Sequence, residues 1–265
     1  MVWASVIQPI EMGKDKLRKF RENETFACLI QPRTDEVLGA EHPLKGRWGE
    51  QMFHNQNPIV LELGCGKGEY TVALAEKYPQ MNFIGIDIKG ARLWKGAKYA
   101  TLNKMGNVAF IRTRVEFIES LFAPGEVSQI WITFADPQEK KAKKRLTHPL
   151  FLNRYRKFLA PDGVIHLKTD SRLLHFYTLE LARCNDMTVL EHNDDIYGSG
   201  RADELLSIKT FYEASFLAQG IPITYMAFKI DNPRPLVEPD WDQEPYEQKY
   251  KTLTRADGHV TSQLE

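Results

Sequence analysis

A single carboxylate, Asp136, stands where the character of the sequence changes abruptly. The run QIWITF before it is apolar and typical of a buried strand, and the run KKAKKR after it is almost entirely cationic. In α/β enzymes the carboxyl ends of strands are where ligands and catalytic side chains gather. Pro137 also fixes the backbone directly after this residue. The pattern therefore predicts that Asp136 projects into a cleft, although it could instead cap a helix or pair with the lysines.

A second candidate site is the glycine-rich loop in LELGCGKGEY, which follows an apolar strand and opens a helical pattern. Gly64, Gly66 and Gly68 permit a tight turn and let a ligand approach the backbone. The next strand ends at Asp87, where a carboxylate commonly binds the ribose hydroxyls of a nucleoside. The glycine-rich loop and Asp87 together predict a nucleoside-containing cofactor.

The spacing of the glycines bears on which cofactor this is. Dinucleotide sites have the spacing G-x-G-x-x-G, which seats a pyrophosphate on a helix N-terminus. This loop has G-x-G-x-G with Glu69 after it and Glu62 before it, and carboxylates are unfavourable beside a phosphate. S-adenosylmethionine carries a sulfonium and an amino group, which both suit a carboxylate. The sequence favours S-adenosylmethionine over a nicotinamide cofactor, although both acids could simply complement the helix dipole.

The elements that position these residues alternate between strand and helix. Seven apolar runs are predicted as strands, at residues 57–64, 81–88, 107–113, 127–136, 162–170, 187–193 and 223–230. Helices are predicted at residues 13–26, 68–79, 89–106, 148–159, 173–184 and 209–220, and residues 31–49 as loop. Strands that are apolar throughout are typical of a parallel sheet covered on both faces. We expect an α/β fold, doubly wound around a mostly parallel seven-stranded sheet, with the pairing of the last two strands open.

Charge and cysteine content limit the setting. Residues 1–170 hold 26 Lys and Arg against 19 Asp and Glu, whereas residues 171–265 hold 9 against 16. A polyanion would therefore bind the first part, although an uneven solvated surface explains the same numbers. Cys28, Cys65 and Cys184 lack the spacing of a disulfide framework or a zinc site, which predicts a reducing, cytoplasmic setting without metal. The sequence has no apolar run long enough to span a membrane.

Five stretches occur in a distinctive order: LELGCGKGEYTVALAEKYP, NFIGIDIKGARLWKGAK, FADPQEKKAKKRLTHPLFL, HLKTD and TFYE. In this order they resemble the bacterial tRNA (guanine-N7)-methyltransferases, over about residues 58 to 230. The glycine loop is shared with many methyltransferases, but D-P-x-x-K-K and T-x-Y-E are much more specific. The resemblance implies a class I methyltransferase (Rossmann-like) domain at residues 41–230, after a basic N-terminal arm (1–40) and before a C-terminal tail (231–265).

The resemblance further implies that the methylated guanine lies in the variable loop of tRNA, and it implies roles for individual residues. Asp136 would be the catalytic residue and would also contact S-adenosylmethionine, the methyl donor. The other donor contacts would be Glu62, Gly64, Gly66, Gly68, Asp87, Arg114 and Glu116. The tRNA substrate would be contacted by Lys140, Asp170, Thr210, Phe211, Tyr212 and Glu213. No metal is expected, and the protein is expected to be a monomer or a homodimer.

The chain departs from the family pattern around Asp136. Ala135, Gln138 and Glu139 stand where the family usually has Pro, Trp and Pro, and the basic run is shorter. Arg114 stands where an Asp commonly follows the third strand, which would leave adenine recognition to the backbone.

The chemistry of guanine N7 fits these residues. N7 carries a lone pair and no proton, so its methylation needs no general base. The product ring is cationic, and a nearby carboxylate would stabilise the developing charge, a task that suits Asp136 or Asp170. The cations at Lys140, Lys141 and Lys143, together with Lys144 and Arg145, are predicted to border the cleft and contact phosphates.

Two other functions remain open at this stage. Methyltransferases acting on an exocyclic amine use Asp/Asn-Pro-Pro-aromatic at the same strand end, and DPQE lacks the second proline and the aromatic residue. A non-catalytic RNA-binding protein on a methyltransferase fold is compatible with the departures from the family pattern.

Overall fold

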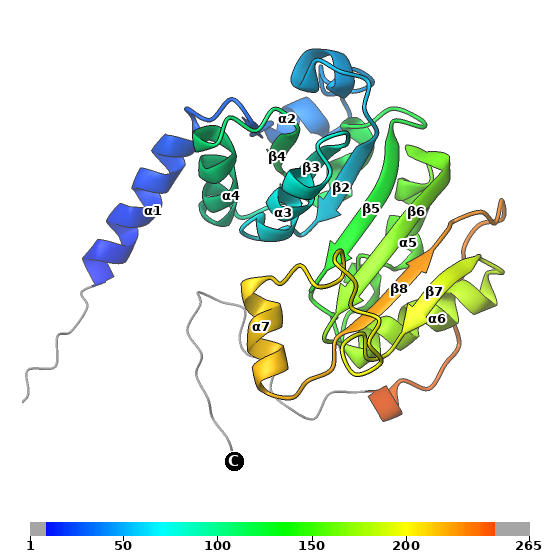
Figure 1. Cartoon of the computed structure of the whole chain (residues 1–265). Coiled ribbons are helices and arrows are strands. Elements are labelled where there is room, and N and C mark those ends of the chain that lie inside the picture. Colours follow the sequence, from blue (N-terminus) through cyan, green and yellow to red (C-terminus); the bar gives the residue numbers. More distant parts are fainter. Residues whose placement is uncertain (1–8, 247–265) are drawn as a thin grey trace, which may run out of the picture.

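One eight-stranded sheet runs through the computed structural model, which describes residues 9–246 and the side chains from residue 15 onward. The strands are β1 (Leu29–Ile30), β2 (Ile59–Leu63), β3 (Asn82–Asp87), β4 (Val108–Arg112), β5 (Val127–Thr133), β6 (Leu159–Thr169), β7 (Val189–Asn193) and β8 (Thr224–Phe228). Their order across the sheet is β1-β4-β3-β2-β5-β6-β8-β7, and Figure 1 labels the strands from β4 to β7 in this order. Strand β8 is antiparallel to both of its neighbours, and the other pairings are parallel.

All seven predicted strands are present, and the predicted class of fold is confirmed. The predicted count of seven is wrong by one, because Leu29 and Ile30 add the short edge strand β1 beside Phe110 and Ile111 of β4. A strand of two residues leaves no alternating pattern in the sequence. It forms because the edge of β4 offers unpaired backbone groups, one of which, the N–H of Phe110, donates to the carbonyl of Cys28 over 2.7 Å.

Seven α-helices accompany the sheet within the described residues: α1 (Pro9–Asn23), α2 (Thr34–Val37), α3 (Glu69–Lys77), α4 (Gly90–Leu102), α5 (Pro149–Tyr155), α6 (Arg172–Cys184) and α7 (Phe211–Ala218). The six predicted helices are all found, whereas the loop predicted at 31–49 contains α2 and the start of a π-helical segment, Trp48–Phe53. Trp48 is fully buried there, and its indole N–H donates to the carbonyl of Leu121 over 2.8 Å. Long-range burial of this ring therefore orders a segment that is locally rich in turn formers.

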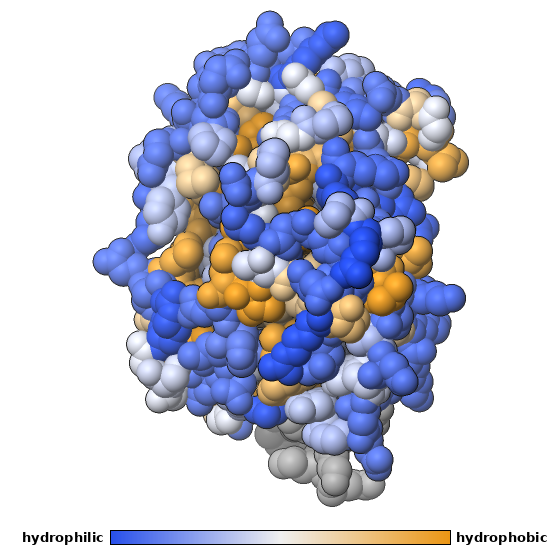
Figure 2. All heavy atoms as spheres, turned by 90° about the vertical axis from the view of Figure 1, so that its right-hand side faces the viewer, coloured by the Kyte–Doolittle hydropathy of each residue, from blue (hydrophilic) through white to orange (hydrophobic). Residues whose placement is uncertain are grey.

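The hydrophobic core has two layers, one on each face of the sheet. Val60 and Phe83 pack with side chains of α3 and α4, whereas the next residues along the same strands, Leu61 and Ile84, pack with side chains of α5 and α6. This alternation is the period-two pattern of a strand buried on both faces. Figure 2 shows one side of the molecule, where hydrophilic residues make up most of the surface and hydrophobic residues show toward the middle. Among the described residues, no helix is long and apolar enough to cross a membrane.

The strand order places a crevice at the end of β2. Strand β2 lies between β3 and β5. The connection after β2 leads to β3 on one side, whereas the connection after β5 leads to β6 on the other, so the two diverge there. Open α/β sheets bind ligands at such a switch point, outside the carboxyl ends of the strands. Both sequence-predicted sites, the glycine loop after β2 and Asp136 after β5, lie at this edge of the sheet.

Candidate active site

The carboxyl ends of β2, β3, β4 and β5 open onto one cleft with two adjoining parts, of about 440 and 390 Å³. The first part is lined by the glycine loop, Asp87 and Asp136, and the second by the segment around Arg114 and Glu116. Residues shared by both parts are Gly64, Asp87, Ile88, Gln138, Lys144 and Leu146. The structure thus brings the two candidate sites of the sequence together into one.

The glycine loop has the shape of a cradle for a ligand. Gly64, Gly66 and Gly68 all have a left-handed backbone, with φ of 74°, 59° and 71°. A Cβ atom at Gly66 would meet no atom within 4 Å, and one at Gly64 would meet only Leu146, at 3.9 Å. A Cβ atom at Gly68 would lie 2.5 Å from the ring of Phe110. The first two glycines therefore open the cleft, and the third allows close packing of α3 on the sheet.

Asp87 joins the glycine loop to the end of β3. One of its carboxylate oxygens accepts a hydrogen bond from the N–H of Gly66 over 3.0 Å, and the other from the N–H of Lys89 over 2.7 Å. A carboxylate can accept about four hydrogen bonds. Asp87 can therefore hold the loop and still accept the two hydroxyls of a ribose, which is the role that the sequence predicted.

Glu62 is a buried acid at the base of the cleft. Its carboxylate accepts hydrogen bonds from the Thr133 hydroxyl over 2.5 Å, from the Thr71 N–H over 2.8 Å and from the Thr71 hydroxyl. Burial raises the pKa of Glu62 to about 7, although these hydrogen bonds oppose the shift. A cation bound in the cleft would favour the ionised form, as the amino group of S-adenosylmethionine would.

The thiol of Cys65 also lies in the glycine loop, where it could suggest nucleophilic catalysis. Burial raises its pKa well above the ordinary value, and the charges of Glu62 and Asp87 raise it further. A thiol that remains protonated is a poor nucleophile. Cys65 therefore serves as a small side chain lining the cleft.

Asp136 sits at the tip of an unusual turn after β5. Phe134 and Gln138 both have a left-handed backbone with φ of 49°, which is uncommon for residues other than glycine. The carboxylate of Asp136 is exposed, and one of its oxygens accepts a hydrogen bond from the N–H of Gln138 over 2.9 Å. Strained backbone of this kind clusters at functional sites, where the surrounding structure holds it in place.

The basic run after this turn is divided between surface and interior. All four lysines of this run are exposed. Lys144 lines both parts of the cleft and Lys143 the second part, whereas Lys140 and Lys141 line neither. Arg145, however, is only 1% exposed. The prediction that Arg145 borders the cleft as a phosphate contact is therefore wrong, because this side chain turns inward.

A buried ion pair ties α7 to the sheet. The ammonium of Lys168, on β6, lies 2.8 Å from a carboxylate oxygen of Glu213, on α7, and both side chains are fully buried. The same ammonium donates to the carbonyls of Leu206 and Ile208, over 2.6 and 3.0 Å. The Tyr197 hydroxyl donates to Glu213 over 2.8 Å. Glu213, predicted as a substrate contact, is thus fully buried and engaged inside the protein, where it holds α7 on the sheet.

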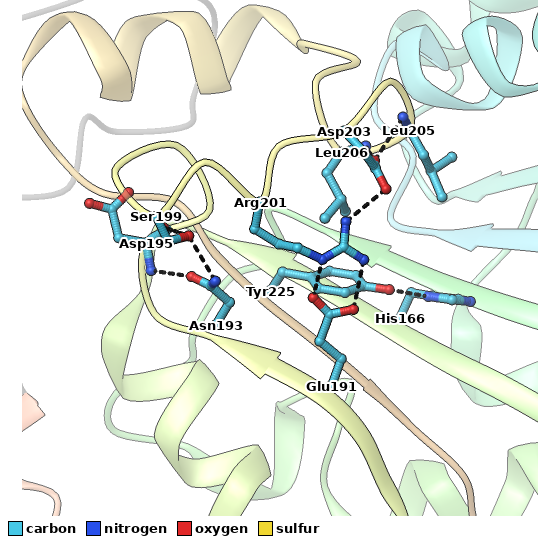
Figure 3. A network of polar contacts seen from close by, with 10 residues as sticks. All are labelled: His166, Glu191, Asn193, Asp195, Ser199, Arg201, Asp203, Leu205, Leu206 and Tyr225. Atoms are coloured by element: carbon cyan, nitrogen blue, oxygen red, sulfur yellow. Dashed lines mark hydrogen bonds and ion pairs between the residues drawn. The ribbon is translucent and has the colours of Figure 1, made fainter.

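The loop between β7 and α7 is held by a second polar network, drawn in Figure 3. Arg201 forms a bidentate ion pair with Glu191 of β7 and a further pair with Asp203, over 2.7 Å. Beside it, the Tyr225 hydroxyl lies 2.9 Å from a ring nitrogen of His166, so β8 and β6 are joined as well. This network fixes the segment whose carbonyls accept from the buried lysine.

The N-terminus of α7 meets the glycine loop. The N–H of Phe211 donates to the carboxylate of Glu69 over 3.0 Å, and the ammonium of Lys67 lies 4.6 Å from the centre of the Phe211 ring. The Thr210 hydroxyl caps the helix by accepting from the N–H of Glu213 over 3.2 Å. Helix α7 therefore covers one side of the cleft.

The predicted substrate contacts fall into different places. Thr210 and Tyr212 line the cleft, and the Phe211 ring is half exposed at its rim. Lys140 is exposed, and Asp170 is only 1% exposed at the end of β6. Among the described residues, neither of these two lines the parts of the cleft given above.

Two predicted donor contacts outside the glycine loop, Arg114 and Glu116, lie side by side in the cleft. Arg114 and Glu116 line the second part of the cleft and form an ion pair with each other over 3.1 Å.

Sequence reasoning missed Lys168 and Thr133, which support the site from inside the sheet. A polar residue within an otherwise apolar strand is the signal that could have found both.

Comparison with known proteins places the chain in a family. Residues 56–226 match the family model described as "Putative methyltransferase". A tRNA (guanine-N(7)-)-methyltransferase of Christiangramia forsetii is 54% identical over 221 residues, which cover 82% of this chain and 99% of the relative. The chain belongs to the tRNA (guanine-N7)-methyltransferase family. The resemblance seen in the sequence is thereby confirmed.

A second relative agrees with this placement, and one solved structure has a similar fold. A tRNA (guanine-N(7)-)-methyltransferase of Bacteroides thetaiotaomicron is 48% identical over 233 residues, covering 88% of this chain and 92% of the relative. The 16S rRNA methyltransferase KamB superposes with a TM-score of 0.52 at 13% identity, over 72% of this chain and 92% of that chain. The last likeness shows a shared fold.

The Lys168–Glu213 pair makes a prediction for stability. Glu213→Ala leaves a buried ammonium without its carboxylate, so we expect the free energy of unfolding to fall by about 3–5 kcal/mol. The double variant Lys168→Met/Glu213→Leu removes both charges and should be markedly more stable than Glu213→Ala. Urea unfolding measures the free energy of unfolding of the wild type and of each variant. Arg183→Ala, which breaks an exposed pair with Glu180, is the control and should change little. A double variant no more stable than the single one would contradict a role of the pair as a buried charge pair.

The raised pKa of Glu62 makes a second prediction. An acid whose pKa is raised from 4.5 to about 7 on folding contributes fully to stability below its unfolded pKa, and that contribution is lost as the pH rises through its folded pKa. Between about pH 4 and pH 8, we expect the free energy of unfolding of the wild type to drop by about 3 kcal/mol relative to Glu62→Gln. Denaturant unfolding of both proteins at a series of pH values measures this. A constant difference between them would show that Glu62 titrates normally.

Proposed function

We propose that the protein transfers the methyl group of S-adenosylmethionine to N7 of a guanine in the variable loop of tRNA. One observation carries the proposal. A single cleft joins the glycine loop and Asp87 on one side to Asp136 and the exposed Lys143 and Lys144 on the other. It occurs in a chain that is 54% identical to a tRNA (guanine-N(7)-)-methyltransferase.

The residues of the first part of the cleft fit this methyl donor. The open space beside Gly64 and Gly66 lets the backbone approach a ligand, and Asp87 would accept the ribose hydroxyls. Glu62 lies at the base of the cleft, where its ionised form would pair with the ammonium group of the donor. When bound, the donor supplies a methyl group activated by a positively charged sulfur. The protein must hold that group in line with the attacking nitrogen, and such orientation can contribute about 7–11 kcal/mol to lowering the barrier.

Asp136 is placed to act on the guanine. N7 attacks with its own lone pair, so no proton has to be removed. As the methyl group is transferred, positive charge grows on the purine ring, and a carboxylate held close to it stabilises that charge. The turn of Asp136 is held by the N–H of Gln138, so the carboxylate is oriented in advance. The other edge of the base, N1–H and the exocyclic amine, would be bound by a second carboxylate, a task that suits Asp170.

The exposed lysines after Asp136 fit the backbone of an RNA. Lys140, Lys141, Lys143 and Lys144 follow the turn in one short segment, and Lys144 reaches the cleft itself. Contacts of this kind supply affinity that falls with salt and carry no sequence information.

The three cysteines are free thiols, which is consistent with action in a reducing cytoplasm.

A labelling experiment tests the reaction. Unmodified tRNA is incubated with the protein and S-adenosylmethionine carrying a labelled methyl group, and the RNA is digested to nucleosides. We expect the label in 7-methylguanosine, and none when the variable-loop guanine is replaced by adenine. Label in an N-methylated adenosine would instead identify an exocyclic-amine methyltransferase. Donor binding without transfer would identify a non-catalytic RNA-binding protein.

Asp136→Asn tests the role of the carboxylate. Asparagine keeps the shape of the side chain and an oxygen that can accept from Gln138, but it removes the negative charge. We expect turnover at saturating substrates to fall by about 10²–10³-fold, as is typical when one stabilising group is lost from a transition state. Donor affinity, measured by calorimetry, should change far less. A large loss of donor affinity with unchanged turnover would show that Asp136 serves the donor and not the reaction.

A further inference from the structure

Arg145 differs from the cations around it because it is buried. Four exposed lysines precede it within six residues, yet its own side chain is only 1% exposed. Removing a guanidinium from water is costly unless its donors are satisfied. Arg145 therefore has a role inside the protein, unlike the exposed lysines before it.

The hydrogen bonds of Arg145 go to the turn that carries Asp136. Its Nε donates to the carbonyl of Pro137, the residue directly after the catalytic carboxylate, over 3.0 Å. Its Nη2 makes a longer contact of 3.5 Å to the carbonyl of Glu139. A guanidinium presents several N–H donors in one rigid plane, which lets it hold two carbonyls of a turn at once.

The other side of the guanidinium rests on an aromatic ring. The central carbon of Arg145 lies 4.3 Å from the centre of the Tyr177 ring, on α6. The Tyr177 hydroxyl donates to Glu238 over 3.0 Å, and Glu238 also pairs with His148, the N-cap of α5. Trp241 packs against the same ring. The ring beneath Arg145 is thus itself held in place, through Glu238 and Trp241 of the segment that follows β8.

The turn needs such support. It contains two left-handed residues that are not glycine, Phe134 and Gln138, and such residues persist only where their surroundings hold them. The hydrogen bond from Gln138 to Asp136 lies within the turn itself. Arg145 connects the turn to the rigid body of the protein.

We propose that Arg145 is a positioning residue for the reaction: it holds the turn of Asp136 in its catalytic geometry and makes no contact with RNA. The inference rests on the proposed function, since it assigns Arg145 a task in that reaction. It separates the basic run into exposed lysines that bind the polyanion and one arginine that shapes the active site.

Arg145→Lys is the first test. Lysine keeps the positive charge but loses the planar set of donors. If Arg145 positions the turn, we expect kcat to fall by about 10²-fold, the size of effect that a displacement of about 1 Å can have. The KM for tRNA and its dependence on salt should stay close to wild type. Turnover is expressed per donor-binding site, measured by calorimetry, so that misfolded protein does not count as lost catalysis.

Arg145→Met is the second test, because it removes the charge. If Arg145 contacted a phosphate, the log–log slope of tRNA affinity against salt would become shallower by roughly 0.7–0.9. We expect that slope to be unchanged in Arg145→Met and shallower in Lys144→Met. Arg183→Met, at an exposed position of α6, should match wild type in kcat, KM and salt dependence.

The outcomes separate this inference from the proposed function. If wild type forms no 7-methylguanosine, the proposed function fails. If wild type forms it and Arg145→Lys retains full kcat, the positioning role alone is overturned. A shallower salt slope in Arg145→Met would also overturn it, in favour of a phosphate contact.

Discussion

A buried ion pair between Lys168 and Glu213 joins the rigid sheet to the helix that covers the cleft. Charges taken out of water are costly, so such a pair is stable only when its remaining hydrogen-bonding groups are satisfied. Here the carbonyls of Leu206 and Ile208 and the hydroxyl of Tyr197 satisfy them. Because these partners come from a long loop, the pair fixes the course of that loop as well as the position of α7. Helix α7 lines one side of the cleft through Thr210 and Tyr212, so the pair also supports that side of the site.

The same sheet edge brings together groups with opposite electrostatic demands. Asp87, together with Glu62 once a bound cation favours its ionised form, places negative charge beside the glycine loop, which suits a cationic methyl donor. Lysines after Asp136 place positive charge on the nearby surface, which suits a polyanionic substrate. The divergence of the chain on either side of β2 keeps these two regions adjacent but separate. The neutral net charge of the chain conceals this local division.

Buried polar residues hold the site in place more than its exposed residues do. Thr133 accompanies Glu62 inside the sheet, and Arg145 reaches the Asp136 turn from below. Each of them satisfies a group that would otherwise be costly to bury. The strained turn after β5 and the glycine loop after β2 are therefore fixed in position before any ligand arrives, which reduces the reorganisation needed for methyl transfer.

The sequence alone determined the class of fold, the seven main strands and the place of the site, because apolar periodicity and glycine spacing are local properties of the chain. It also led to the family, through short stretches whose order is specific. The tertiary structure alone showed the direction in which each polar side chain points. Arg145 is like Lys144 in sequence but buried, and Glu213 belongs to the T-x-Y-E motif but faces the core. Strand β1 likewise has no pattern of its own. These features depend on partners distant in the sequence, such as Tyr177, and no local pattern contains that information.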